Sequence, residues 1–116
     1  MANKKEQGFA GEQIAEKFLK EKGYKILGKN YSTKAGEIDI IARKNKILVF
    51  VEVKTRSSDQ FGVPAEAVNQ KKLARLAIVA QQYIQNKHLE KTPFIFEIVS
   101  VTKTNNDYSC EIIPVD

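Results

Sequence analysis

The residues best suited to chemistry are charged side chains inside two otherwise apolar segments. Residues 47–55 are rich in Ile, Val and Phe but contain Glu52 and Lys54, and residues 36–42 contain Glu37 and Asp39. Carboxylates that converge in an apolar setting must take up a proton or hold a cation. We therefore expect Asp39 and Glu52 to hold Mg²⁺ or Mn²⁺. Lys54 would then orient a nucleophile or stabilise the transition state of phosphodiester hydrolysis.

This prediction depends on how the two segments pair. A polar stretch separates them, so we expect an antiparallel hairpin. With Lys44 and Asn45 as its two-residue turn, Glu37 lies opposite Glu52, and Asp39 is a diagonal neighbour of Glu52 on the same face. Diagonal neighbours are roughly 7–8 Å apart. A three-residue turn would reverse the faces and separate these side chains.

Glu52 and Lys54 also have a purely structural interpretation. Two residues apart on a strand, they share a face and can form an ion pair that serves only the fold. Asp39, Glu37 and Glu12 weigh toward a site, since a structural pair has no need of three further carboxylates. Both interpretations stay open at this level.

The apolar pattern predicts the elements that must position these residues. A stripe at 3.6-residue spacing marks a helix over residues 6–22, with Glu12 at its edge. A second stripe runs through residues 64–87, with a possible break at Asn69. The expected strands are residues 24–31, 36–42, 47–55, 94–101 and, weakly, 111–115, with a loop at 57–63. A helical crossover between the third and fourth strands predicts one α/β domain, residues 1–116, with helices flanking a mixed sheet.

The start of the second helix adds candidate contacts for a phosphate backbone. Gln70 has the spacing of an inward-facing residue and could hydrogen-bond the site or a phosphate, although a role at the first helical position, satisfying a local backbone group, explains it at least as well. Lys71, Lys72 and Arg75 follow, and Arg56 comes directly after the Glu52 segment. Basic side chains in this arrangement are suited to tracking a nucleic acid, although a solvated helix face explains them as well.

Composition excludes several other classes of protein. The chain has 116 residues, a net charge of +5, one Cys and one His, so it lacks the ligands for a zinc site or a histidine triad. Its longest apolar run is far shorter than the roughly 20 residues that span a bilayer, and no signal peptide is evident. We expect a soluble cytoplasmic protein without a membrane partner. Residues 1–91 contain 18 basic and 10 acidic side chains, which favours a polyanionic partner.

Several motifs, in order, closely resemble the YraN-type family of small uncharacterised bacterial proteins. The resemblance rests on these segments: Gly8-x-x-Gly11-Glu12-x-x-Ala15, Gly23-Tyr24-x-Ile26-Leu27-x-x-Asn30, Gly36-Glu37-Ile38-Asp39-Ile40-Ile41-Ala42, Val49-Phe50-Val51-Glu52-Val53-Lys54-Thr55-Arg56, Phe61-Gly62-x-Pro64-x-Glu66-Ala67-Val68 and Lys72-x-x-Arg75-Leu76. That family resembles a branch of the PD-(D/E)xK nucleases, near the archaeal Holliday-junction resolvases.

The resemblance implies a restriction-endonuclease-like sandwich and a role for each motif residue. Asp39 would be the metal-binding Asp, and Glu52 and Lys54 the E-x-K pair. The Val53 carbonyl would be an extra ligand, and Glu12 the carboxylate of the first helix that approaches the metal. The sequence departs from the pattern at Ile38, where the superfamily often has proline, and at Glu97, where the family more often has Asp.

The expected function is a Mg²⁺-dependent endonuclease acting on branched or otherwise structured DNA in repair or recombination. The size of the chain and the family analogy suggest a homodimer. Two alternatives remain: a nucleic-acid-binding or adaptor module without turnover, and RNA in place of DNA as the substrate.

Overall fold

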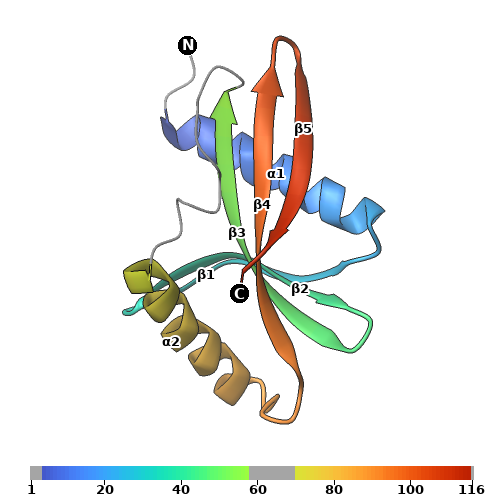
Figure 1. Cartoon of the computed structure of the whole chain (residues 1–116). Coiled ribbons are helices and arrows are strands. Elements are labelled where there is room, and N and C mark those ends of the chain that lie inside the picture. Colours follow the sequence, from blue (N-terminus) through green and yellow to red (C-terminus); the bar gives the residue numbers. More distant parts are fainter. Residues whose placement is uncertain (1–3, 58–69, 116) are drawn as a thin grey trace.

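The computed structural model describes residues 4–57 and 70–115, with side chains from residue 10 onward. It contains two helices and five strands (Figure 1). In chain order they are α1 (Lys4–Glu21), β1 (Lys25–Thr33), β2 (Gly36–Lys44), β3 (Ile47–Ser57), α2 (Gln70–Asn86), β4 (Phe94–Thr104) and β5 (Asp107–Pro114). The sequence predicts a loop at 57–63, but Ser57 is the last residue of β3. The rest of that loop, the helical start at Pro64 and the break at Asn69 lie outside the described residues.

The five strands form one mixed sheet in the order β1-β2-β3-β4-β5. β3 and β4 are parallel, while the other neighbouring pairs are antiparallel. Parallel neighbours require a crossover connection, and here it contains α2. The predicted α/β fold with helices flanking a mixed sheet is confirmed, and the order αβββαββ agrees with a restriction-endonuclease-like sandwich.

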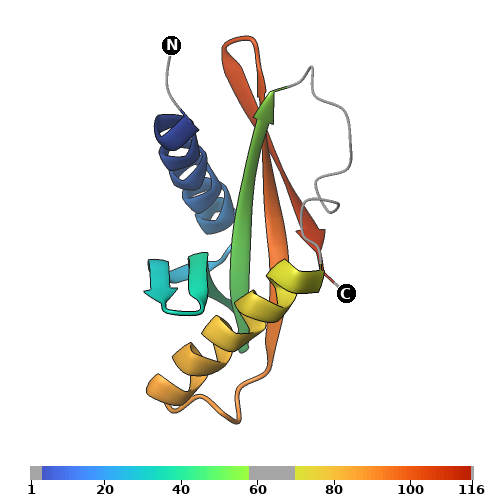
Figure 2. The same ribbon diagram turned by 90° about the vertical axis from the view of Figure 1, so that its left-hand side faces the viewer.

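The two helices cover opposite faces of the sheet, so the protein has two apolar layers (Figure 2). On one face Ala15 and Leu19 of α1 pack with Ile40 and Val51. On the other face the apolar side of α2 packs on the sheet, with its buried residues Leu76, Val79, Ala80, Tyr83 and Ile84. The helical spacing of these residues explains why this segment forms an amphipathic helix.

The β2–β3 hairpin has a different register from the one predicted. Lys44 pairs with Ile47, so the two-residue turn is Asn45-Lys46 rather than Lys44-Asn45. Asn45 adopts a left-handed conformation with φ 56°, which asparagine tolerates better than lysine. Ile41 consequently pairs with Phe50, and the predicted pairing of Glu37 with Glu52 is wrong by two residues.

The last strand is longer than predicted. β5 begins at Asp107 and pairs with β4 along its length, from Thr104↔Asp107 to Glu97↔Pro114. The turn before it contains Asn105 at φ 52°, again a left-handed asparagine. Among the described residues, no helix is long and apolar enough to cross a membrane.

Gly11 sets how closely α1 approaches β3. A Cβ on Gly11 would overlap the Thr55 hydroxyl and lie 3.2 Å from Thr55 Cβ. A glycine at this position therefore permits close packing of the helix against the strand, at a cost in helix propensity of about 1 kcal/mol relative to alanine. Because Glu12 is the next residue, this contact also determines where the Glu12 carboxylate lies.

We expect Gly11→Ala to lower the free energy of unfolding by about 1–3 kcal/mol, because α1 or Thr55 must move to admit the methyl group. Urea denaturation measures the change. Gly28→Ala is the matched control, since a Cβ on Gly28 has no heavy atom within 4 Å. Equal stability of the two variants would contradict the close approach.

Candidate functional site

The candidate site begins where β2 and β3 separate. Their ladder ends at Ile40↔Val51. Two residues further along β3, the Val53 backbone N–H donates to Asp39 Oδ2 at 2.8 Å. The Asp39 carboxylate thus accepts from a β3 amide beyond the end of the β2 ladder, and it is held beside the gap between the two strands.

The separation also disrupts the alternation of side chains along β2. Ile38 and Ile41 both pack in the α2 layer, whereas Ile40 packs in the α1 layer. Strict period-2 alternation would place Ile38 and Ile40 on one face. The predicted common face for Asp39 and Ile41 is therefore wrong: Asp39 approaches Glu12 of α1, on the other side of the sheet from the Ile41 side chain.

Three carboxylates converge at this point. Glu12, Glu37 and Asp39 each offer an oxygen, and these atoms all lie within 4.8 Å of one another. We call these three residues the carboxylate cluster. Glu12 comes from α1 and the other two from β2, so the cluster joins the helix to the sheet. Glu37, which the sequence indicated only as a supporting residue, is a full member.

Two polar residues of β1 orient the cluster. With its amide nitrogen toward the carboxylates, Asn30 donates to Glu37 Oε1 at 3.1 Å and to Glu12 Oε1 at 3.3 Å. Ser32 Oγ donates to Glu37 Oε2 at 3.1 Å. Asn30 has φ 53°, a conformation in which asparagine is enriched. Sequence reasoning did not identify either residue as part of the site, because their role depends on the pairing of β1 with β2.

The cluster strongly favours a bound proton or cation. Burial raises the pKa of Asp39 to about 7, and the Glu52 and Glu12 carboxylates add to this effect against the opposing Val53 hydrogen bond. Burial also raises the pKa of Glu12, helped by the charges of Glu37 and Glu52. Three carboxylates are hard oxygen ligands of the kind that Mg²⁺ and Mn²⁺ prefer. The donor set and its electrostatics therefore fit a divalent ion.

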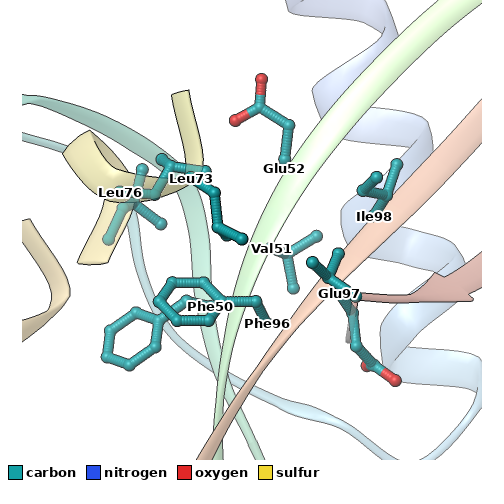
Figure 3. A pocket seen from close by; sticks show the side chains of 10 residues that line it. Phe50, Val51, Glu52, Leu73, Leu76, Phe96, Glu97 and Ile98 are labelled. Atoms are coloured by element: carbon teal, nitrogen blue, oxygen red, sulfur yellow. The ribbon is translucent and has the colours of Figure 1, made fainter. Parts of the chain in front are cut away.

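Glu52 lies outside the carboxylate cluster and is paired with two lysines. Its Oε1 is 2.5 Å from Lys72 Nζ on α2 and 3.4 Å from Lys54 Nζ. The Glu52 side chain is only 11% exposed. Figure 3 shows the carboxylate pointing away from the apolar side chains of Phe50 and Leu73. We call Glu52, Lys54 and Lys72 the ion-paired group.

The ion-paired group and the carboxylate cluster influence each other. The Glu52 charge contributes to the raised pKa of both Asp39 and Glu12. Burial lowers the pKa of Lys54, and the nearby Lys72 ammonium lowers it further. A buried, hydrogen-bonded ion pair is costly to break, so Glu52 is held in place on the α2 side of β3.

The remaining predicted site residues differ in their exposure and in whether they contact the carboxylate cluster. Val53, predicted to offer its carbonyl, contacts Asp39 through its N–H. Lys71 and Arg75 are exposed on α2, and Arg56 is half-buried near the end of β3. Gln70 is also exposed, so the prediction that it faces inward is wrong. It is the first residue of α2, where side chains lean toward the N-terminal end of the helix.

Comparison with known proteins identifies the family. The model of the uncharacterised protein family UPF0102 matches residues 11–101. The chain belongs to the UPF0102 family. This confirms the predicted YraN-type membership, and the matched range includes every candidate site residue.

UPF0102 relatives are similar over most of their length. A UPF0102 protein of Alkaliphilus metalliredigens is 50% identical over 97 residues, which cover 84% of this chain and 85% of the relative. One from Clostridioides difficile is 48% identical over 99 residues, covering 85% and 87%. One from Hahella chejuensis is 46% identical over 92 residues, covering 79% and 74%.

The raised pKa of Asp39 predicts how the stability of this UPF0102 protein depends on pH. An Asp with an ordinary pKa near 3.8 and a folded-state pKa of about 7 binds its proton more tightly in the folded state. In EDTA we therefore expect the free energy of unfolding to fall as the pH rises from about 4 to 7, by about 2–4 kcal/mol. Denaturant titrations across this range measure the slope.

Asp39→Asn tests the assignment, because its amide oxygen can still accept from Val53 N–H but carries no charge. We expect this variant to lose most of the slope and to exceed the wild type in stability at pH 8 in EDTA. Asp107→Asn, at an exposed position in β5, should keep the slope of the wild type. A wild-type slope in Asp39→Asn would contradict the assignment.

Proposed function

We propose that this UPF0102 protein is a divalent-metal-dependent endonuclease that hydrolyses phosphodiester bonds of DNA. The observation that carries the proposal is the convergence of Glu12, Glu37 and Asp39 near two half-buried lysines, Lys54 and Lys72, in a protein with a net charge of +5. A binding module for a polyanion gains nothing from clustered carboxylates, because they repel phosphate. A nuclease needs them to hold a cation.

The carboxylate cluster would hold Mg²⁺ or Mn²⁺, with Asp39 and Glu12 as the most buried of its ligands. Bound there, the ion would polarise a phosphate and lower the pKa of a water molecule. Glu52 and the Val53 carbonyl, both ligands in the predicted assignment, lie on the neighbouring strand. In the structure Glu52 pairs with lysines, so its participation requires at least one of these pairs to loosen.

The lysines of the ion-paired group have separate tasks in this proposal. The Lys54 ammonium lies 3.4 Å from Glu52 Oε1 and would stabilise negative charge that develops on the phosphate. Lys72 approaches Glu52 from α2 and fixes its orientation. Because two ammonium groups share one carboxylate, the group has one positive charge in excess, which is available to a phosphate.

Basic residues around the site would position the DNA. Lys71 and Arg75 are exposed and four residues apart on α2, so they lie on one face of the helix. Together with Arg56 they are suited to contacting successive phosphates. Such contacts carry no base information, and they agree with recognition of DNA structure rather than sequence.

In its finer part, the proposal is that the substrate is branched DNA and that the protein acts on it as a homodimer. Within the described residues, carboxylates that can share an ion form a single cluster. One cluster cuts one strand at a time. Symmetric cutting of two strands at a junction therefore requires a second copy related by a two-fold axis.

Manganese binding tests the ligand set. We expect Glu37→Gln to weaken Mn²⁺ binding at least about tenfold, because it removes one of three converging carboxylates. Lys72→Met should strengthen binding, since it removes a cation that interacts with both Glu52 and Asp39. Isothermal titration calorimetry measures both changes, with Lys103→Met as the exposed control. Unchanged affinity in Glu37→Gln would remove that residue from the ligand set.

Cleavage tests the activity. We expect the wild type with Mg²⁺ or Mn²⁺ to cut at least one of duplex, flap and four-way-junction DNA, with RNA as a fourth substrate. Asp39→Asn should slow cleavage at least about 100-fold, the scale on which loss of one transition-state-stabilising group acts. Asp107→Asn should cut like the wild type.

An adaptor protein would give a different result in the same panel. It would bind one of the four substrates without cutting it, and Asp39→Asn would leave the affinity unchanged. Cleavage by Asp39→Asn at the wild-type rate would contradict the proposed site itself.

A further inference from the structure

A second cationic surface lies at the far end of β2 from the carboxylate cluster. Three segments meet there: the start of β1, the β2–β3 hairpin and the connection from α2 to β4. Lys25 and Arg43 are paired positions on neighbouring strands. We call this surface the basic end, and it contains Lys25, Arg43, Lys44, Lys46, Lys87 and Lys91, all of them exposed.

The positive charge of the basic end lacks acidic partners among the described residues, although Lys44 Nζ lies over the Tyr24 ring, 4.9 Å from its centroid. In the described part of the chain, none of its six cations forms an ion pair, whereas Lys20, Lys29, Lys54 and Lys72 each pair with a glutamate. Residues 25–27, 43–48 and 87–92 contain one acidic residue, Glu90. Clustered like charges cost stability unless a partner neutralises them, so the surface is suited to a polyanion.

The shape of the basic end narrows the choice of polyanion. A depression lies between the hairpin and the α2–β4 connection, and Arg43, Asn45, Lys46 and Thr92 supply its polar lining. Leu48 is among the apolar side chains that complete it. Guanidinium, ammonium, amide and hydroxyl groups all donate to phosphate oxygens. A convex phosphodiester backbone can enter a depression of this kind, whereas a flat bilayer surface contacts only its rim.

The nearby aromatic residue also argues against a membrane. Phe94 is 37% exposed, but its ring packs edge to face against Phe50 and Phe96, with centroids 5.9 Å away in each case. A ring held on both sides in this way is not free to insert between lipid chains.

The basic end and the carboxylate cluster lie at opposite ends of β2. Arg43 is four residues beyond Asp39 on this strand, which is about 13 Å at roughly 3.3 Å per residue, and Lys46 lies beyond the turn. Arg43 pairs with Leu48 of the α2 layer, whereas the Asp39 carboxylate approaches Glu12 of α1, so the two sites face opposite sides of the sheet. The basic end is therefore a surface separate from the candidate site.

We propose that the basic end binds the phosphate backbone of a nucleic acid duplex. This inference does not rest on the proposed function, because the basic end contains no residue of the candidate site.

The experiment measures binding in EDTA, so that cleavage plays no part. Fluorescence anisotropy gives the affinity of a 20-base-pair duplex at several salt concentrations. We expect Arg43→Gln/Lys46→Gln to bind more weakly than the wild type and to reduce the slope of log affinity against log salt by about 2, close to one for each lost phosphate contact. Lys17→Gln/Lys103→Gln removes the same charge from exposed positions elsewhere and should change the slope by much less.

Three results would overturn the inference. One is an equal slope for the two double variants, and another is no duplex binding by the wild type. The third is a double variant that loses binding to vesicles containing anionic lipid while it keeps duplex binding. Asp39→Asn keeps the basic end, so its failure to abolish cleavage would count against the proposed function and leave this surface unaffected.

Discussion

The hydrogen bond from Val53 N–H to the Asp39 carboxylate is the constraint on which the site depends. A strand that leaves its neighbour exposes backbone amides, and an unpaired buried amide is costly. Asp39 satisfies one such amide with a side chain and so permits β2 to diverge from β3. The same carboxylate is buried beside Glu12 and Glu52, which raises its pKa to about 7. One contact thus accompanies the end of a β-ladder and holds the carboxylate that we propose as a metal ligand.

The carboxylate cluster and the ion-paired group lie on opposite sides of the sheet, and their charges influence each other across it. Glu12 and Asp39 approach one another on the α1 side, while Glu52 meets Lys54 and Lys72 on the α2 side of β3. The two lysines exceed the single charge of Glu52, whereas no carboxylate of the cluster forms a salt bridge within the described residues. An ion bound by the cluster would offset its negative charge and would join α1 to β2, which supply its three carboxylates.

Much of the fold follows from local patterns, and much of the site follows from residue type. The apolar stripe of α2 and the Ile- and Val-rich segments predict the elements well, because burial on one face imposes a period. The hairpin register was missed because the turn begins one residue later than expected, with Asn45 in a left-handed conformation as its first residue. The register error was two residues, an even number, so Ile41 still shares a face with Leu48 and Phe50 as predicted.

Other parts of the site depend on tertiary contacts that no local pattern reveals. At Asp39 the period-2 alternation of side chains along β2 is interrupted, and the Asp39 side chain makes a hydrogen bond there. This interruption becomes visible only when the pairing of the strands is known. Asn30 reaches Glu12 and Glu37 because β1 pairs with β2 through an irregular register. Lys72 has the sequence signature of a solvated helix residue, yet α2 brings it onto Glu52 across the crossover.

The central claim is that the carboxylate cluster holds a divalent ion, and anomalous diffraction from crystals soaked in Mn²⁺ tests it most directly. We expect one strong manganese peak about 2.1 Å from oxygens of Asp39 and Glu12, with Glu37 close by. We also expect the peak to be lost in crystals of Asp39→Asn. A well-ordered cluster without manganese at saturating concentration, or a peak held only by other residues, would contradict it.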